Sequence, residues 1–392
     1  MEISSKTKEE RLRTLSKAFS PSSPIKKTDF FFGRIEQLSN VCDAINEQGQ
    51  HAILFGERGV GKTSLANKMT ESFTNLFPVI VTCNRKDTFN NIWTQALGKV
   101  QYSKTTKGIG FKPTDIEQFV NLGAYIDPKS KNLQSDIINL LNNYKKYTFL
   151  FIFDEFDNII NERTREDFAD LIKSFSDNVT NSTIVLVGIA DDIETLIGNH
   201  QSLERCLKQV KMPRMSKKEC EEIIDNGLTL LDIKISPKVK EKIIEFASGF
   251  PHYVHLLCKY GAQEIIENNK YEFSQGYLNI AIKKGIDNTN EQLKASYRKA
   301  IVGTKKWQDI IFACTQSPID NYNCINKMDI IKNYNIISSS NVSGGTISYN
   351  LKQFCSADRG NVLTKIGSGI NTRYRFTNPM MRAFVKLKIN SN

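Results

Sequence analysis

The sequence has no apolar run long enough to cross a membrane. Its longest runs, such as FLFIF at 149–153, have the size of a strand, whereas a membrane-spanning helix needs about 20 apolar residues. The first residues include acidic side chains and lack the apolar core of a secretory signal. These absences predict a soluble, globular chain, and its 392 residues are enough for two or three domains.

Signals for disulfides and for nucleophilic catalysis are also missing. The eight cysteines are scattered, without a CxxC pair, so we expect a reducing, cytoplasmic setting. The sequence contains no G-x-S-x-G motif and no cysteine with an evident histidine partner. His252, His255 and Cys258 are spaced superficially like metal ligands, but they turn around an apolar helix, which favours core packing.

Acidic residues are scarce in the last quarter of the chain. From Glu291 to the end there are 15 Lys and Arg against 5 Asp and Glu, which accounts for nearly all of the net charge of +11. This asymmetry indicates a polyanionic partner for the C-terminal region. The alternative is a solvated basic face that has no partner.

The apolar pattern divides the chain into four parts. Residues 1–29 are polar and basic and predict an N-terminal arm. Residues 30–213 alternate strands with helices, apart from an expected insertion at 103–131. The expected strands are 51–55, 78–83, 148–154 and 183–188. Each is a nearly continuous apolar run, which is typical of strands buried on both faces of a parallel sheet.

The two remaining parts lack such strands. Residues 214–290 show helical periods throughout, including a serine-led helix start at Ser216, and predict a small all-helical lid domain. Residues 291–392 contain three short amphipathic helices and then a hairpin pattern around Gly367-Ser368-Gly369. This order of elements predicts a basic winged helix-turn-helix domain.

Residues 52–63, AILFGERGVGKT, place a glycine-rich loop between a strand and a helix. The segment matches the pattern G-x-x-x-x-G-K-[ST] in the context that this pattern requires. Backbone N–H groups of such a loop surround phosphate oxygens, and the helix start directs its positive dipole end at the same anion. Lys62 is expected to contact the β- and γ-phosphates and Thr63 to bind Mg²⁺. The expected nucleotide contacts in this loop are Gly56, Glu57, Arg58, Gly59, Val60, Gly61, Lys62, Thr63 and Ser64.

A second segment, FLFIFDE at 149–155, ends a buried strand with two carboxylates. Open α/β sheets bind ligands at the carboxyl ends of their strands, which places these acids beside the phosphate loop. Asp154 is then expected to hold Mg²⁺, and Glu155 to orient and polarise the attacking water. The alternative for such a pair, taken alone, is a simple helix cap.

With these motifs the stretch 30–290 resembles the AAA+ ATPases, and within them the origin-recognition/Cdc-type and STAND-like branch. Gly33 and Arg34, followed by Glu36, resemble the element that lines the adenine pocket in that group. Gly188-Ile189-Ala190-Asp191 stands where the group has a sensor, with Asp191 in place of asparagine.

Two further positions follow from the same resemblance. Arg205 falls where the family has an arginine finger, which implies a homo-oligomer because the finger acts on a neighbouring subunit. The alternative for Arg205 is a surface salt bridge on a loop. Pro251 and His252 open the helix that carries a second sensor arginine in the family, and His252 replaces that arginine. Together with Asp191, this replacement predicts slow hydrolysis.

The expected fold is therefore an α/β AAA+ core with a P-loop, an all-helical lid and a C-terminal winged helix. The expected function is that of an ATPase that uses ATP and Mg²⁺ to control its oligomerisation and its engagement of DNA. The expected DNA contacts, from the third helix at about 344–355 and the hairpin, are Lys352, Lys365, Arg373 and Arg375. One alternative is a STAND-like switch whose winged helix binds a protein effector, and another is a structural subunit with negligible turnover.

Overall fold

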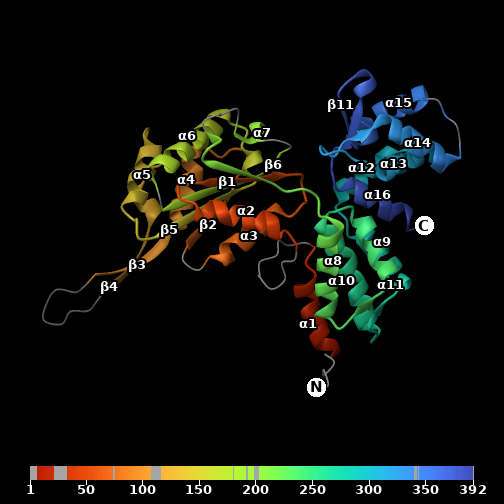
Figure 1. Cartoon of the computed structure of the whole chain (residues 1–392), viewed down its shortest axis with the longest axis horizontal. Helices are drawn as coiled ribbons and strands as arrows, with labels where there is room; N and C mark the ends of the chain where they lie inside the picture. The colour runs from red at the N-terminus through yellow and green to blue at the C-terminus, as the bar shows by residue number, and fades with distance from the viewer. Residues whose placement is uncertain are drawn as a thin grey trace.

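The computed structural model describes residues 7–21, 33–73, 76–106, 116–179, 181–190, 193–197, 203–339, 342 and 344–391. In these residues the chain forms an α/β unit, a helical lid and a C-terminal unit of helices with a small sheet (Figure 1). None of their helices combines the length and the apolar content that a membrane-spanning segment requires. All eight cysteines carry free thiols.

A parallel sheet of five strands forms the centre of the α/β unit, in the order β2-β5-β6-β1-β7. The strands are β1 (His51–Gly56), β2 (Leu76–Thr82), β5 (Thr148–Asp154), β6 (Ser182–Ile189) and β7 (Leu207–Lys211). The four strands expected from apolar runs are present, and β7 is an additional edge strand. Because the strands are parallel, their carboxyl ends share one edge of the sheet, which is where ligands bind in such folds.

Helices cover both faces of this sheet. Those on one face are α2 (Ile35–Asn46) and α3 (Lys62–Ser72), and those on the other are α4 (Phe89–Gly98), α5 (Leu133–Asn142) and α6 (Glu162–Asn178). Successive side chains of β5 alternate between the two cores, with Phe151 on the side of α4 to α6 and Ile152 on the side of α2 and α3. Burial on both faces explains why the three inner strands, β5, β6 and β1, are apolar almost without interruption.

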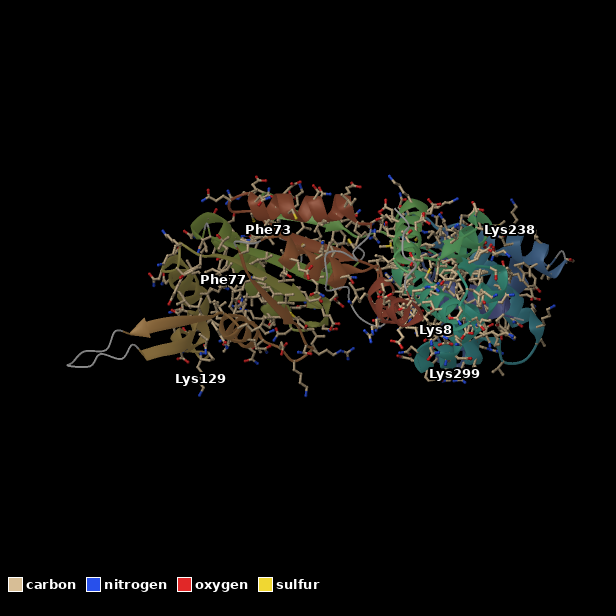
Figure 2. All side chains as sticks on the ribbon, turned by 90° about the horizontal axis from the view of Figure 1, so that it is seen from below. Lys8, Phe73, Phe77, Lys129, Lys238 and Lys299 are labelled. Carbon is tan, nitrogen blue, oxygen red and sulfur yellow. The ribbon has the colours of Figure 1, made fainter. Side chains whose placement is uncertain are left out.

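The segment expected as an insertion contains β3 (Gln101–Thr106) and β4 (Ile116–Asn121). They pair with each other in antiparallel fashion and form a separate two-stranded sheet. Figure 1 and Figure 2 both show this pair extending away from the α/β unit. A short helix, α7 (Glu194–Ile197), follows β6.

The lid lies beyond the carboxyl edge of the sheet and consists mainly of helices. They are α8 (Lys217–Thr229), α9 (Pro237–Ala247), α10 (Pro251–Glu267) and α11 (Gln275–Asp287), with a short parallel pair formed by β8 (Lys234–Ile235) and β9 (Glu272–Phe273). Ser216 and Glu219 form the capping box that starts α8, as the sequence predicts.

Helix α1 (Lys8–Ala18) packs against α8 and α10, so the described N-terminal residues belong to the lid in space (Figure 1). The buried guanidinium of Arg11 donates hydrogen bonds to the carbonyl oxygens of Leu231 (2.8 Å) and Lys270 (2.9 Å). Phe19 is fully buried, and a Cβ at Gly227 of α8 would collide with its ring. Figure 2 shows the start of α1 among the lid side chains. This segment is therefore anchored, whereas the sequence predicted an arm.

The C-terminal unit, residues 291–391, contains five helices and a three-stranded antiparallel sheet in its described part. Its elements are α12 (Glu291–Ile301), α13 (Lys305–Gln316), β10 (Ile325–Asn326), α14 (Lys327–Ser338), α15 (Gly344–Gln353), β11 (Leu363–Ile366), β12 (Arg373–Phe376) and α16 (Met381–Ile389). The expected hairpin is the β11–β12 pair. Helix α16 packs on α9 and α11, and one apolar core is continuous through the sheet, the lid and this unit.

Candidate nucleotide-binding site

The phosphate loop runs from the end of β1 to the start of α3. Gly61 has a φ of 99°, a left-handed conformation that suits glycine, and it directly precedes Lys62 at the helix start. A Cβ at Gly56 would meet the carbonyl oxygen of Met212, so the loop approaches the chain that follows β7 closely. The predicted strand–loop–helix geometry is therefore present.

Lys62 is buried and turned back onto its own loop. Its Nζ donates to the carbonyl oxygens of Gly56 (2.9 Å) and Glu57 (2.7 Å). Burial lowers the pKa of Lys62 from 10.5 to about 8, although the nearby carboxylates of Asp157 and Asp154 oppose the shift. In the described part of the chain this ammonium group forms no ion pair with a carboxylate, and a phosphate group would supply an anionic partner.

The two acids at the end of β5 have different surroundings. Asp154 is buried, and its Oδ1 accepts a hydrogen bond from the backbone N–H of Glu155 (2.9 Å). Glu155 is exposed and has a φ of 55°, and its Oε2 accepts from the side-chain amide of Asn158 (3.0 Å). A buried acid fits a fixed metal ligand, and an exposed acid fits a group that orients water.

These residues line one cavity of about 480 Å³ at the carboxyl edge of the sheet. From the α/β unit the lining includes Arg58, Gly59, Val60, Gly61, Lys62, Thr63, Ser64, Asp154, Glu155, Gly188 and Ile189. Arg34, which precedes α2 of the α/β unit, also lines it, and from the lid side the lining includes Ser20, Pro21, Pro251 and His252. The structure therefore brings together most of the residues that the sequence predicted for nucleotide and metal binding.

Asp157 is a cavity residue that the sequence analysis did not select. Its Oδ1 accepts a hydrogen bond from the backbone N–H of Ile189 (2.7 Å), which ties the chain after β5 to the end of β6. The signal for it was available, because Asp157 stands three residues beyond Asp154 in the same acidic stretch. Ser20 and Pro21 were also missed, since nothing in a polar segment indicated that it would fold against the lid.

The lid side of the cavity is closed by the start of α10. The Nδ1 of His252 lies 2.8 Å from the carbonyl oxygen of Pro21 and therefore donates to it. Burial lowers the pKa of His252, so this side chain is neutral near pH 7. His255 and Cys258 are both buried; Cys258 lies in the apolar core, whereas His255 also lines the cavity. Within the described residues, no group of three or more His, Cys, Asp and Glu side chains could hold a metal ion.

Arg34 supports the loop from behind. Its φ is 63°, and its buried NH2 group donates to the carbonyl oxygens of Val60 (3.2 Å) and Pro213 (2.5 Å). Its NH1 atom lies 3.6 Å from Glu219 of the lid. Burial lowers the pKa of Arg34, and the charge of Glu219 opposes this shift. Gly33 packs on the same glutamate.

One sequence candidate from the family resemblance, Arg205, is not part of this cavity. Arg205 is exposed and forms an ion pair with Asp177 at 2.8 Å, the alternative that the sequence left open. Asp191 lies outside the described residues.

The C-terminal cations divide into exposed and engaged groups. Lys352 and Lys365 are exposed, whereas Arg373 pairs with Asp320 at 2.7 Å. Arg375 lines a second cavity, of about 710 Å³, between the C-terminal unit and the phosphate-loop residues Glu57 and Arg58.

The family model of novel STAND NTPase 1 (nSTAND1) matches residues 18–302, well over half of the chain. A Walker-type ATPase of Pyrococcus abyssi is similar in structure, with 14% identity, a TM-score of 0.52, and coverage of 93% of this chain and 99% of that one. The ORC2 protein of Aeropyrum pernix, solved as ADPNP–ADP complexes, has 13% identity, a TM-score of 0.50, and coverage of 96% and 97%.

No curated protein matches the sequence. The two structural likenesses concern the fold, and they confirm the predicted AAA+ core. The chain therefore belongs to the novel STAND NTPase 1 family, and it is an enzyme, a P-loop NTPase with the fold of the AAA+ ATPases.

Proposed function

We propose that this chain is an ATP-dependent switch that binds ATP with Mg²⁺, hydrolyses it slowly, and uses the nucleotide state to control assembly and the engagement of a partner. The observation that carries the proposal is the cavity in which a buried lysine of the phosphate loop and a buried aspartate of β5 meet under the lid. This arrangement suits a triphosphate with its metal ion.

The chemistry assigned to the chain's own groups follows from their positions. Lys62 exchanges the carbonyl oxygens of Gly56 and Glu57 for β- and γ-phosphate oxygens, which neutralise its buried charge. Thr63 and Asp154 hold Mg²⁺, which would supply charge neutralisation at the phosphates. Glu155 orients and polarises the attacking water, and its bond from Asn158 fixes its direction.

We also propose that the chain hydrolyses ATP slowly and assembles with further copies of itself. A neutral His252, already bonded to Pro21, offers the γ-phosphate less charge than an arginine, and the sequence has Asp191 where the resembling family has an asparagine sensor. Arg205 is proposed to leave Asp177 and reach the phosphates of a neighbouring subunit. An exposed ion pair of this kind stabilises a protein by about 1 kcal/mol or less, so breaking the pair between Arg205 and Asp177 costs little free energy.

For the C-terminal unit we propose a winged-helix domain that contacts double-stranded DNA. The order α13, β10, α14, α15, β11, β12 supports this, because three helices precede a hairpin wing. Exposed Lys352 on α15 and Lys365 on β11 are the cations proposed for phosphate contacts.

A second candidate is a switch in which this unit binds a protein effector. The observation favouring it is that the predicted DNA-contacting arginines are engaged within the chain. Arg373 pairs with Asp320, and Arg375 lines the cavity facing the phosphate loop. A further arginine of this unit, Arg382 on α16, is buried and donates to the carbonyl oxygen of Ser317 (2.7 Å).

The nucleotide proposal is tested by titrating the protein with MgATP. The parent should bind, whereas Lys62→Ala should lose affinity by at least about a hundredfold because a buried charge-assisted contact is removed. Lys173→Ala, at an exposed position of α6, is the matched control and should bind like the parent. Equal binding by Lys62→Ala and the parent would refute the assignment.

The DNA proposal is tested by measuring duplex binding at increasing salt, with and without ATP. The double variant Lys352→Gln/Lys365→Gln should bind more weakly at low salt and lower the salt slope by about two. Lys238→Gln, at an exposed lid position labelled in Figure 2, is the control. No retention of duplex DNA at low salt, with or without ATP, would leave the protein-effector candidate.

A further inference from the structure

Glu57, the second residue of the phosphate loop, carries the carboxylate of a closely matched ion pair. Arg214 donates to it twice, from Nε to Oε2 at 2.7 Å and from NH2 to Oε1 at 3.1 Å. Both side chains are only 12% exposed, so the pair is shielded from solvent, unlike an ordinary surface salt bridge. Two hydrogen bonds between the same side chains fix their relative orientation as well as the distance between them.

Arg214 is held by the lid independently of the loop. It lies between β7 and α8, and its guanidinium carbon is 4.7 Å from the centroid of the Phe250 ring. A Cβ at Gly249 would come within 2.8 Å of the Cβ of Arg214, so the backbones are in close contact here. The backbone N–H of Met215 donates to the carbonyl oxygen of Gly249 (2.8 Å). These contacts hold the guanidinium of Arg214 in the orientation in which it binds the carboxylate of Glu57.

Glu57 is consequently held at two points. Its carbonyl oxygen accepts from Lys62 and its carboxylate accepts from Arg214. When Lys62 turns to a phosphate, the first contact is given up, while the second does not involve Lys62 and can persist. The carboxylate pair is then the contact that keeps the first half of the loop in position.

The same arginine faces the C-terminal unit. The pKa of Arg382 on α16 is lowered to about 10, first by burial and then by the charge of Arg214. The pKa of Lys386 is lowered by burial, by Arg382 and, in a smaller part, by Arg214. The charge of Glu57 opposes the lowering of the Arg382 pKa, and that of Glu245 opposes the lowering of the Lys386 pKa.

We infer that Glu57 and Arg214 form a positioning pair: through Glu57, Arg214 holds the phosphate loop in the shape that receives the nucleotide phosphates. This inference rests on the proposed nucleotide function. Neither side chain takes part in the hydrolysis reaction. Replacing Glu57 or Arg214 should therefore weaken nucleotide binding and leave the rate of the hydrolysis step nearly unchanged.

The test is a double-mutant cycle with Glu57→Gln, Arg214→Gln and the double variant. For each protein we would measure the Kd for MgATP, and KM and kcat for hydrolysis. Each single variant should raise Kd and KM about tenfold, with kcat changed less than about twofold, and the double variant should lose no more than either single one. Lys240→Gln, which breaks the lid pair with Asp225, is the matched control and should leave all three constants unchanged.

Hydrogen exchange separates positioning from loss of folding. In the single variants the backbone of residues 56–61 should exchange faster, while β5 keeps its protection. Single variants that bind MgATP like the parent would overturn the inference, and so would additive losses in the double variant. A parent that binds no MgATP at all would instead refute the proposed function, so the two failures are distinguishable.

Discussion

Nucleotide affinity should fall at alkaline pH because of Lys62. Burial lowers the pKa of this lysine from 10.5 to about 8. Bound phosphates favour the charged form and raise the pKa again, so binding takes up a proton whenever the pH exceeds about 8. The affinity for nucleotide is therefore highest below pH 8 and declines at higher pH as Lys62 of the free protein deprotonates.

The size of the effect follows from the same value. With a pKa of about 8 in the free protein and a restored pKa in the complex, Kd should rise about 25-fold between pH 7.5 and 9.5. The γ-phosphate is fully ionised over this range, since its last pKa lies near 6, so the nucleotide contributes little. Most of the change should appear above pH 8.

Calorimetric titration with MgATP at constant ionic strength measures this change. Titrations in two buffers of different ionisation enthalpy also report the proton taken up on binding. Lys62→Arg is the matched control, because a guanidinium stays charged throughout, and its Kd should be flat with pH even if binding is weaker. A flat Kd in the parent, or the same slope in Lys62→Arg, would refute the role of the buried ammonium.

Three other substitutions test the site and the lid. Glu155→Gln should bind MgATP like the parent and hydrolyse it at least about a hundredfold more slowly, as seen by retained ATP in single-turnover assays; unchanged turnover would exclude Glu155 from the reaction. Phe19→Ala should lower the free energy of unfolding by about 3–5 kcal/mol in urea, because a fully buried ring is removed. Arg11→Met should cost about 2–4 kcal/mol in the same assay, since the carbonyl oxygens of Leu231 and Lys270 lose their donor; a parent-like midpoint for either would show that α1 does not anchor the lid.

Three of the four strands that the sequence predicted share one physical property. β1, β5 and β6 are buried on both faces, so their apolar runs are nearly uninterrupted and visible without any knowledge of the fold. The fourth, β2, lies at the sheet edge and is only partly buried, although its run is apolar too. The missed strand β7, LKQVK, lies at the sheet edge, and only its Leu207 and Val210 are buried. With only five residues and two lysines, it resembles a loop. This segment is a strand because it pairs with β1, and a contact between segments so far apart in the chain is not visible in the local sequence.

The site was predictable where the chemistry is local. The phosphate loop and Asp154 with Glu155 occur in short motifs whose spacing is set by a single turn of chain. Glu57 was selected only as a member of that loop, because its partner Arg214 is 157 residues away. Pro21 likewise meets His252 across 231 residues. Contacts of this kind leave no periodic or spacing signal in one sequence.

Net charge was the weakest guide to function in this chain. The count of Lys, Arg, Asp and Glu from Glu291 onward assumes that every cation in this region is free to bind a polyanion. In the structure, Arg359 lies 3.9 Å from the centroid of the Trp307 ring, and Arg373 and Arg382 are bonded to groups of their own unit. These arginines hold the C-terminal unit together, so their removal is expected to affect its stability first.

The charge available for an anionic partner is therefore smaller than the count of +10 indicates and is carried by exposed lysines such as Lys352 and Lys365. A lysine is a mobile point charge, which suits phosphate contacts that position a protein without reading sequence. If DNA is the partner, binding should be strongly salt-dependent and nearly indifferent to sequence. Sequence-selective binding would require contacts beyond this set of cations, and binding without salt dependence would indicate that the partner is not a polyanion.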